Sequence, residues 1–334
     1  MNEEIQSLGS KLDAMKARMS LPAISAPMFL VSGPQMVINA CKSGVIGSFP
    51  ATNARSIKDL RDWLVEISES VTANDASWAL NLITHNSYGR FDEEMALVEE
   101  FQPELVITAL GGPHRVTEQV HAYGGLVFAD VNSPKYARKA LEKGADGLVL
   151  VCAGAGGHTG EYAMLPFIEE LRSFFDGPLI VGGGIGTGQA IRAVELLGAD
   201  FAYLGTRFLA AGESLINDDY RQMVWDSSME DLVLSRAITG ALGNWMRASV
   251  DAAGLSMDAM KTNAKIDFSE DMHSGSKAWK HVWSAGQGVG TIVKPETIVE
   301  IVKTLSDGYD QALLKETQAS PFLRAAGITQ SENN

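Results

Sequence analysis

Short runs of apolar and β-branched residues recur along the first two-thirds of the chain, and a segment with helical periodicity follows each run. Eight runs begin at residues 23, 45, 77, 105, 125, 147, 178 and 201, with a mean spacing of about 25 residues, the length of one strand plus one helix. Both faces of each run are apolar, as expected of parallel strands buried between a core and a helical layer. The pattern therefore predicts eight βα units.

Start and stop signals mark the helices between these runs. Ser56 precedes an amphipathic segment as a capping residue, while Ser133 and Pro134 open another segment that Gly144 ends. Eight units without a remote edge strand favour an α/β fold closed into a (β/α)8 TIM barrel. An open, doubly wound sheet fits the same alternation and is the alternative.

The pattern changes after Thr206, since residues 207–283 contain helical runs and no obvious buried strand. A barrel of this type needs about 250 residues, so a chain of 334 has a surplus of roughly 80. We expect this surplus to form a small helical lid inserted after strand eight, at 213–283. The barrel would then comprise 1–212 and 284–334, with Pro295 opening the last helix.

Charge and composition exclude several classes of protein. The chain has 41 acidic and 27 basic residues and a net charge of −14, which disfavours nucleic acid and anionic membranes as partners. With 46% hydrophobic residues, disorder is excluded. The N-terminus lacks the pattern of a signal peptide, and the apolar runs are too short to span a bilayer, so we expect a cytoplasmic location.

Two glycine-rich loops follow strands seven and eight, at residues 182–188 and at Gly205. Glycines at a strand-to-helix junction let backbone N–H groups approach an anion, and the helix N-terminus adds partial positive charge. Barrels commonly bind phosphate at these two strands. The loops therefore predict a phosphate site, with tight turns alone as the alternative.

His158 is the main candidate for proton transfer because it follows paired glycines in the loop after strand six, at the same rim. His85, just past strand three, is a second candidate. Glu161 is an alternative base, although a surface carboxylate is the favoured interpretation of this residue. The other histidines, His114, His121, His273 and His281, have no comparable setting.

Polar residues near other strand ends have two interpretations. Asn81 in strand three is either a structural hydrogen-bonding group or a ligand contact, because an unpaired amide is costly to bury. Asp130 and Asn132 end strand five and either contact a ligand or cap the next helix. The chain has two cysteines, which indicate no disulfide framework or zinc site; Cys152 lies in an apolar run and is read as structural.

Five motifs occur in order and carry a family resemblance: SAPM, AGAGGHTG, PLIVGGGIGTG, GADFAYLGTRFLAAGES and WSAGQGVG. Together, from about Pro22 to Gly290, they resemble the nitronate monooxygenase family, formerly 2-nitropropane dioxygenases. Flavin-dependent enoyl-acyl carrier protein reductases and NADH:quinone reductases share this signature. The family loop commonly has an acidic residue before AGGH, where this chain has Gly154 and Ala155, so the substrate orientation does not carry over.

The resemblance implies an FMN-dependent barrel without a metal, in which a nitronate reduces the flavin and O2 then yields a carbonyl compound and nitrite. His158 matches the family's active-site histidine, a proton-transfer residue or substrate anchor. The residues implied to bind the cofactor are Ala26, Pro27, Met28, Asn81, Gly157, Gly182, Gly183, Gly184, Gly205, Thr206 and Gln287. Trp245 and Arg247 in the lid either shape the substrate pocket or, for Trp245, form lid core.

The sequence is also consistent with two other functions. The first is a flavin reductase that takes hydride from NAD(P)H and passes it to an enoyl thioester or a quinone. The second is a phosphate-binding barrel without redox activity. We expect a small-molecule substrate in each case, and the exposed faces of the insertion and of the last helix could support a homodimer.

Overall fold

Eight parallel strands close into a barrel in the computed structural model, which describes residues 2–261 and 282–317. The strands, in their order around the barrel, are β1 (Ala23–Ser25), β2 (Ile46–Pro50), β3 (Trp78–Ile83), β4 (Leu105–Ala109), β5 (Leu126–Val131), β6 (Gly147–Val151), β8 (Leu179–Gly182) and β9 (Phe201–Leu204). Each predicted run contains one of them. The predicted (β/α)8 barrel is confirmed, because β9 pairs with β1 and leaves no open sheet.

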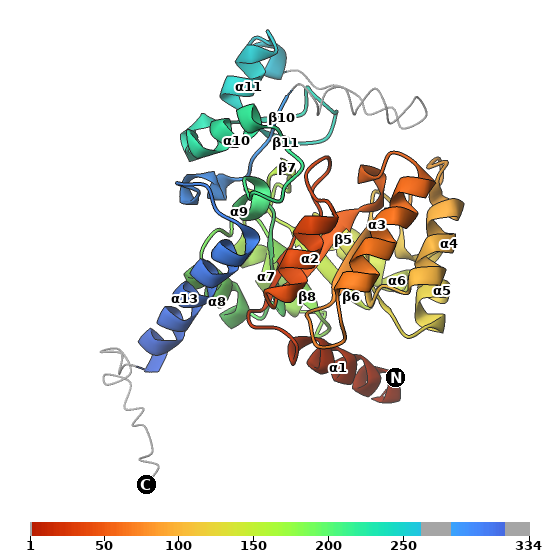
Figure 1. Ribbon diagram of the computed structural model, residues 1–334. Coiled ribbons are helices and arrows are strands. Elements are labelled where there is room, and N and C mark those ends of the chain that lie inside the picture. The colour runs from red at the N-terminus through yellow and green to blue at the C-terminus, as the bar shows by residue number, and fades with distance from the viewer. Residues whose placement is uncertain (1, 262–281, 318–334) are drawn as a thin grey trace.

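Helices form the outer layer of the barrel (Figure 1). They are α2 (Pro34–Lys42), α3 (Ile57–Ser70), α4 (Phe91–Phe101), α5 (Thr117–Ala122), α6 (Pro134–Glu142), α7 (Met164–Arg172), α8 (Gly188–Leu196) and α13 (Ile298–Thr317). Ser56 caps α3 in a reciprocal capping box with Asp59, and the Ser133 hydroxyl accepts from Tyr136 N at 3.3 Å to cap α6. The predicted helix starts at these two serines are confirmed.

The last helix begins three residues later than predicted, at Ile298. Glu296 forms a parallel bridge with Ala211, so the chain is still extended after Pro295. Thr297 immediately precedes the first helical residue, and its N–H donates to the Glu300 carboxylate at 2.8 Å, as at a capped helix N-terminus.

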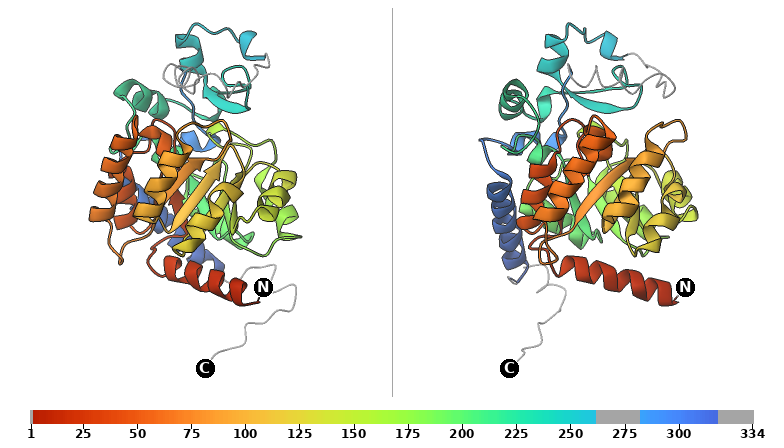
Figure 2. Two further views of the ribbon diagram at one scale, coloured as in Figure 1. Left: turned by 90° about the vertical axis from the view of Figure 1, so that its right-hand side faces the viewer. Right: turned by 45° about the vertical axis from the view of Figure 1, so that its right-hand side comes forward.

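One end of the barrel is closed by α1 (Asn2–Lys16), and the inserted segment covers the other end (Figures 1 and 2). Leu12 and Met15 of α1 pack with inward-facing side chains of the strands, among them Ile24 and Phe201. Strand side chains alternate between this interior and the helical layer. Because the insertion follows β9, it lies at the end of the barrel where the loops after the strands meet. Active sites of barrel enzymes lie at this end.

The short helix α9 (Thr206–Leu209) follows β9 and precedes the insertion. The insertion contains α10 (Asp218–Trp225) and α11 (Arg247–Ala252), and also β10 (Leu232–Ser235) and β11 (Gly243–Met246). These strands join β7 (Gly157–His158) in a three-stranded sheet of order β10-β11-β7. The prediction of a purely helical lid without strands is therefore wrong. Each strand has four residues, and Val233 of β10 and Trp245 of β11 pack in a small core separate from that of the barrel.

Short 3-10 turns complete the described structure. They are η1 (Ala51–Asn53), η2 (Pro113–Arg115), η3 (Met229–Asp231), η4 (Ala259–Lys261) and η5 (Gln287–Thr291). Part of the predicted lid, including His273 and His281, lies outside the described residues. Across the described ranges, no helix is both long and apolar enough to cross a bilayer.

Candidate active site

The loop after β8 has the backbone of an anion-binding turn. Gly183 has a φ of 153° and Gly184 a φ of 72°, conformations that residues with a Cβ rarely adopt. The following helix, α8, is capped by Thr187, whose hydroxyl accepts from Ala190 N at 3.2 Å. The glycine turn thus leads into a helix N-terminus, where unpaired N–H groups and the helix dipole favour negative charge.

The loops after β9 and β1 lie side by side at the same rim. A Cβ atom placed on Gly205 would lie 3.5 Å from Met28 Sδ and 3.8 Å from Ala26 Cβ, so this glycine lies at van der Waals distance from the loop after β1. Thr206 Oγ1 accepts a hydrogen bond from Gly286 N at 2.8 Å. The fold therefore brings together predicted cofactor residues from the first and last strands.

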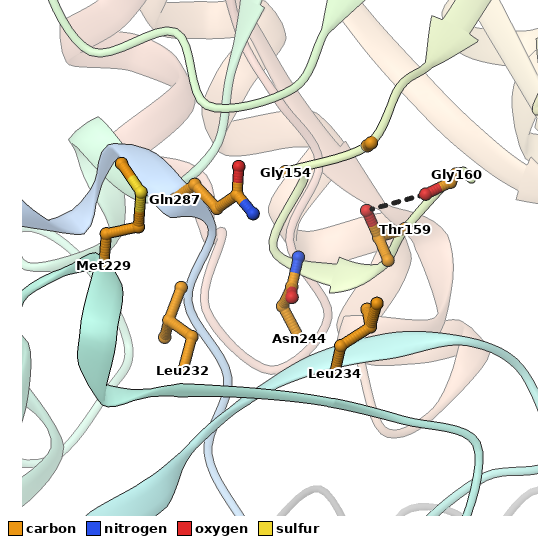
Figure 3. A pocket seen from close by; sticks show the side chains of 9 residues that line it. Gly154, Thr159, Gly160, Met229, Leu232, Leu234, Asn244 and Gln287 are labelled. Carbon is orange, nitrogen blue, oxygen red and sulfur yellow. Dashed lines mark hydrogen bonds between the residues drawn. The ribbon is translucent and has the colours of Figure 1, made fainter. Parts of the chain in front are cut away.

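Gln287 lies beside the loops after β6 and β8. Its backbone N–H donates to Gly154 O at 2.9 Å, and a Cβ atom on Gly184 would lie 3.7 Å from Gln287 Cβ. A cavity of about 140 Å³ opens here (Figure 3). The apolar side chains of Met229, Leu232 and Leu234 line it together with the polar side chains of Thr159, Asn244 and Gln287. Its volume is below the roughly 300 Å³ or more of typical ligand pockets.

His158 lies at the edge of the three-stranded sheet and pairs with Gly243 of β11, while Gly157 pairs with Asn244. Strand alternation puts the His158 side chain on the face opposite to that of Asn244, which lines the cavity. His158 Nε2 lies 3.0 Å from Thr239 Oγ1. Solvent reaches the side chain, yet desolvation by the surrounding protein lowers the pKa of the imidazole.

Three polar side chains project into the barrel near its mouth. Asn81 donates from Nδ2 to Ile107 O at 3.1 Å, which supports the structural interpretation of this residue. Asp130 Oδ1 and the Tyr203 hydroxyl are buried without a hydrogen-bond partner. Burial raises the pKa of the Asp130 carboxyl to about 7, and burial together with Asp130 raises the pKa of Tyr203 well above its usual value.

Tyr203 is not among the residues predicted from the sequence. Its position in an apolar run and the alternation of strand side chains could have indicated a polar group that faces the barrel interior. Buried polar atoms without partners normally indicate a missing ligand or water. The unpaired oxygens of Asp130 and Tyr203 therefore mark the inside of the mouth as a place where a polar ligand would be stabilised.

Other candidates have structural partners. His85 Nδ1 lies 2.8 Å from Ser87 Oγ in a local turn, and exposed Glu161 pairs with Arg236 at 2.9 Å. Cys152 is buried, and burial raises the pKa of its thiol to about 12, so it is no thiolate nucleophile. Trp245 is fully buried in the lid core, whereas Arg247 contacts Met257 Sδ at 3.5 Å.

A family model described as "Nitronate monooxygenase" matches residues 35–308, most of the chain. The chain belongs to the nitronate monooxygenase family. It is accordingly an oxidoreductase of a flavin-dependent family that acts on small molecules. The "Nitronate monooxygenase" of Neurospora crassa is 24% identical over 364 residues, which cover 94% of this chain and 96% of that protein.

Another relative, from Rhodococcus jostii, is named "(3aS,4S,5R,7aS)-5-hydroxy-7a-methyl-1-oxo-octahydro-1H-indene-4-carboxyl-CoA dehydrogenase". It is 24% identical over 219 residues, and the match spans 66% of this chain but only 60% of that protein. Among solved structures, nitroalkane oxidase from Streptomyces ansochromogenes superposes with a TM-score of 0.76 at 21% identity, over 91% of this chain and all of that one. This similarity confirms the fold.

The residues of this family member fit a flavin nucleotide. The positive φ angles of Gly183 and Gly184, just before the N-terminus of α8, form a backbone cradle suited to a phosphate group. The unpaired oxygens of Asp130 and Tyr203 provide polar contacts inside the mouth for a heteroaromatic ring system.

Proposed function

We propose that the protein is an FMN-dependent nitronate monooxygenase that oxidises alkyl nitronates with O2 to a carbonyl compound and nitrite. The proposal rests on one observation. Two glycine loops suited to a phosphate and a histidine of lowered pKa lie at the same end of the barrel. Family membership supports the redox class.

In this proposal the backbone around residues 182–184 and at Gly205 and Thr206 binds the FMN phosphate. Ala26, Pro27, Met28 and Asn81 lie near the flavin ring, while Gly157 and Gln287 close one side. FMN supplies the electron transfer. The protein supplies position and electrostatics, and its net charge of −14 means that local N–H groups must hold the anionic cofactor.

His158 is the proposed catalytic base or substrate anchor. Because desolvation lowers its pKa, the neutral form of the imidazole is favoured, and it can accept a proton in the active site or donate one hydrogen bond to an oxygen of the nitronate. We further propose that residues 213–283 act as a lid and substrate domain that shields this step from water.

Two measurements on the purified protein test the function. Visible absorbance and mass spectrometry of the released cofactor should identify bound FMN, whereas a colourless protein that cannot be reconstituted would contradict any flavin role. Anaerobic mixing with propionate 3-nitronate should then bleach the flavin rapidly, and readmitted O2 should restore its colour with release of nitrite.

A second candidate is a reductase that takes hydride from NAD(P)H and reduces an enoyl thioester or a quinone. The Rhodococcus jostii relative, whose name gives a coenzyme A thioester as substrate, favours this alternative. Anaerobic mixing with NADH separates the two functions. Rapid bleaching by NADH but not by the nitronate would establish the reductase and overturn the proposed monooxygenase.

A further inference from the structure

The inserted segment holds the loop that carries His158. Backbone pairing of β11 with β7 joins Gly243 to His158, and Thr159 N donates to Leu242 O at 2.9 Å. On the other side of the histidine, Asn244 Nδ2 donates to Ala155 O at 2.7 Å. The backbone on both sides of His158 is therefore attached to a hairpin that lies more than 80 residues further along the chain.

The turn of that hairpin also reaches the imidazole. Gly240, with a φ of 81°, lets the chain reverse directly after Thr239, whose Oγ1 lies 3.0 Å from His158 Nε2. The same hydroxyl donates toward Ala241 O at 3.4 Å. A threonine hydroxyl has one proton, so if that proton points to Ala241 O, Thr239 Oγ1 must accept from Nε2–H.

We propose that Thr239 is a positioning residue that holds the His158 ring with its proton on Nε2, which leaves Nδ1 unprotonated in the neutral ring. This inference rests on the proposed function for the catalytic role of His158, but the contact itself does not. The insertion would then be part of the active site, because it sets both the position and the tautomer of the histidine.

Histidine-selective ¹⁵N NMR of the FMN-loaded enzyme tests the tautomer directly, with His158→Gln used to assign the signal. In the wild type, Nε2 should show the shift of a protonated ring nitrogen and Nδ1 that of an unprotonated one. Thr239→Val should move both shifts toward a mixture of tautomers, and Thr239→Ser should restore them. Unchanged His158 signals in Thr239→Val would overturn the proposal.

Turnover gives the second readout. Loss of one positioned hydrogen bond predicts a fall in kcat of about tenfold in Thr239→Val, with recovery in Thr239→Ser and unchanged FMN content. Thr317→Val, at the exposed end of α13, is the matched control and should leave kcat unchanged. If Thr239→Val does not fold, Thr239→Ala serves in its place, since it also lacks the hydroxyl.

Two combinations of results distinguish the catalytic role of His158 from the positioning role of Thr239. If Thr239→Val alters the tautomer while His158→Ala keeps full activity, the catalytic role of His158 is wrong and the contact is right. If His158→Ala is inactive while Thr239→Val retains both wild-type shifts and wild-type kcat, the proposed function stands and the positioning role of Thr239 is wrong.

Discussion

At the scale of single residues, His158 is the group on which the proposed chemistry depends. Removing a general base typically costs 10²-fold to 10⁴-fold in rate. We expect His158→Ala to keep its FMN absorbance and to lose about that much of kcat with a nitronate substrate. Stopped-flow bleaching of the flavin measures the effect. A variant with wild-type bleaching would show that proton transfer or anchoring lies elsewhere.

Asp130 predicts a pH dependence of stability. Burial raises the pKa of its carboxyl from 3.8 to about 7. Below about pH 4 both folded and unfolded chains hold the proton. As the pH rises toward 7 the unfolded chain releases it first, so the folded state loses stability. At about 1.36 kcal/mol per pKa unit, the loss reaches at most about 4 kcal/mol above pH 7.

Asp130→Asn removes this titration and should therefore be more stable than the wild type at pH 8, but not at pH 4. Urea unfolding of both proteins across this range measures the difference. Glu94, whose pKa burial also raises to about 7, titrates in both proteins and cancels in the comparison. An equal pH slope in the two proteins would show that Asp130 is ionised in the folded state.

At the scale of elements, a buried ion pair joins α9, which follows β9, to the segment just before α13. Arg207 Nη2 lies 2.7 Å from Glu296 Oε2, with about one-twentieth of each side chain exposed. Removing one partner leaves an uncompensated buried charge, which typically costs 3–5 kcal/mol. We expect Glu296→Gln to lower the free energy of unfolding by about this much, as measured by urea denaturation.

An exposed ion pair provides the control. Lys58 and Asp62 of α3 are 2.5 Å apart and largely solvated, so Lys58→Ala should change the free energy of unfolding by less than about 1 kcal/mol. Replacing both Arg207 and Glu296 with Met should recover much of the loss, because the pair's desolvation cost disappears with it. Equal effects of the two single substitutions would contradict the burial argument.

At the scale of the whole molecule, the net charge of −14 opposes an anionic cofactor. Salt screens this repulsion, with a Debye length of about 8 Å at physiological ionic strength. We therefore expect FMN to associate with the apoprotein faster as salt is raised from low concentration. Stopped-flow flavin fluorescence measures the rate. A rate that falls with salt would indicate an attractive local field strong enough to outweigh the global charge.

The barrel could be predicted from the sequence because its strands are buried on both faces. Such strands appear as continuous apolar runs, and their spacing of one strand plus one helix identifies the parallel topology. The caps at Ser56 and Ser133 and the glycine turn after β8 are equally local, since each depends on residues within a few positions of one another. The motif order was sufficient to indicate the family.

Only the tertiary structure decided what surrounds His158 and what lies inside the mouth. The strands β10 and β11 have four residues each. Burial alternates along β10, whereas β11 is buried throughout but includes Gly243 and Asn244, so neither sequence forms a long apolar run. Their pairing with β7 joins segments far apart in the chain, and Thr239 reaches His158 across 81 positions. Barrel closure likewise brings the charge of Asp130 on β5 close enough to affect Tyr203 on β9. Such proximities come from chain closure and packing, which no local pattern records.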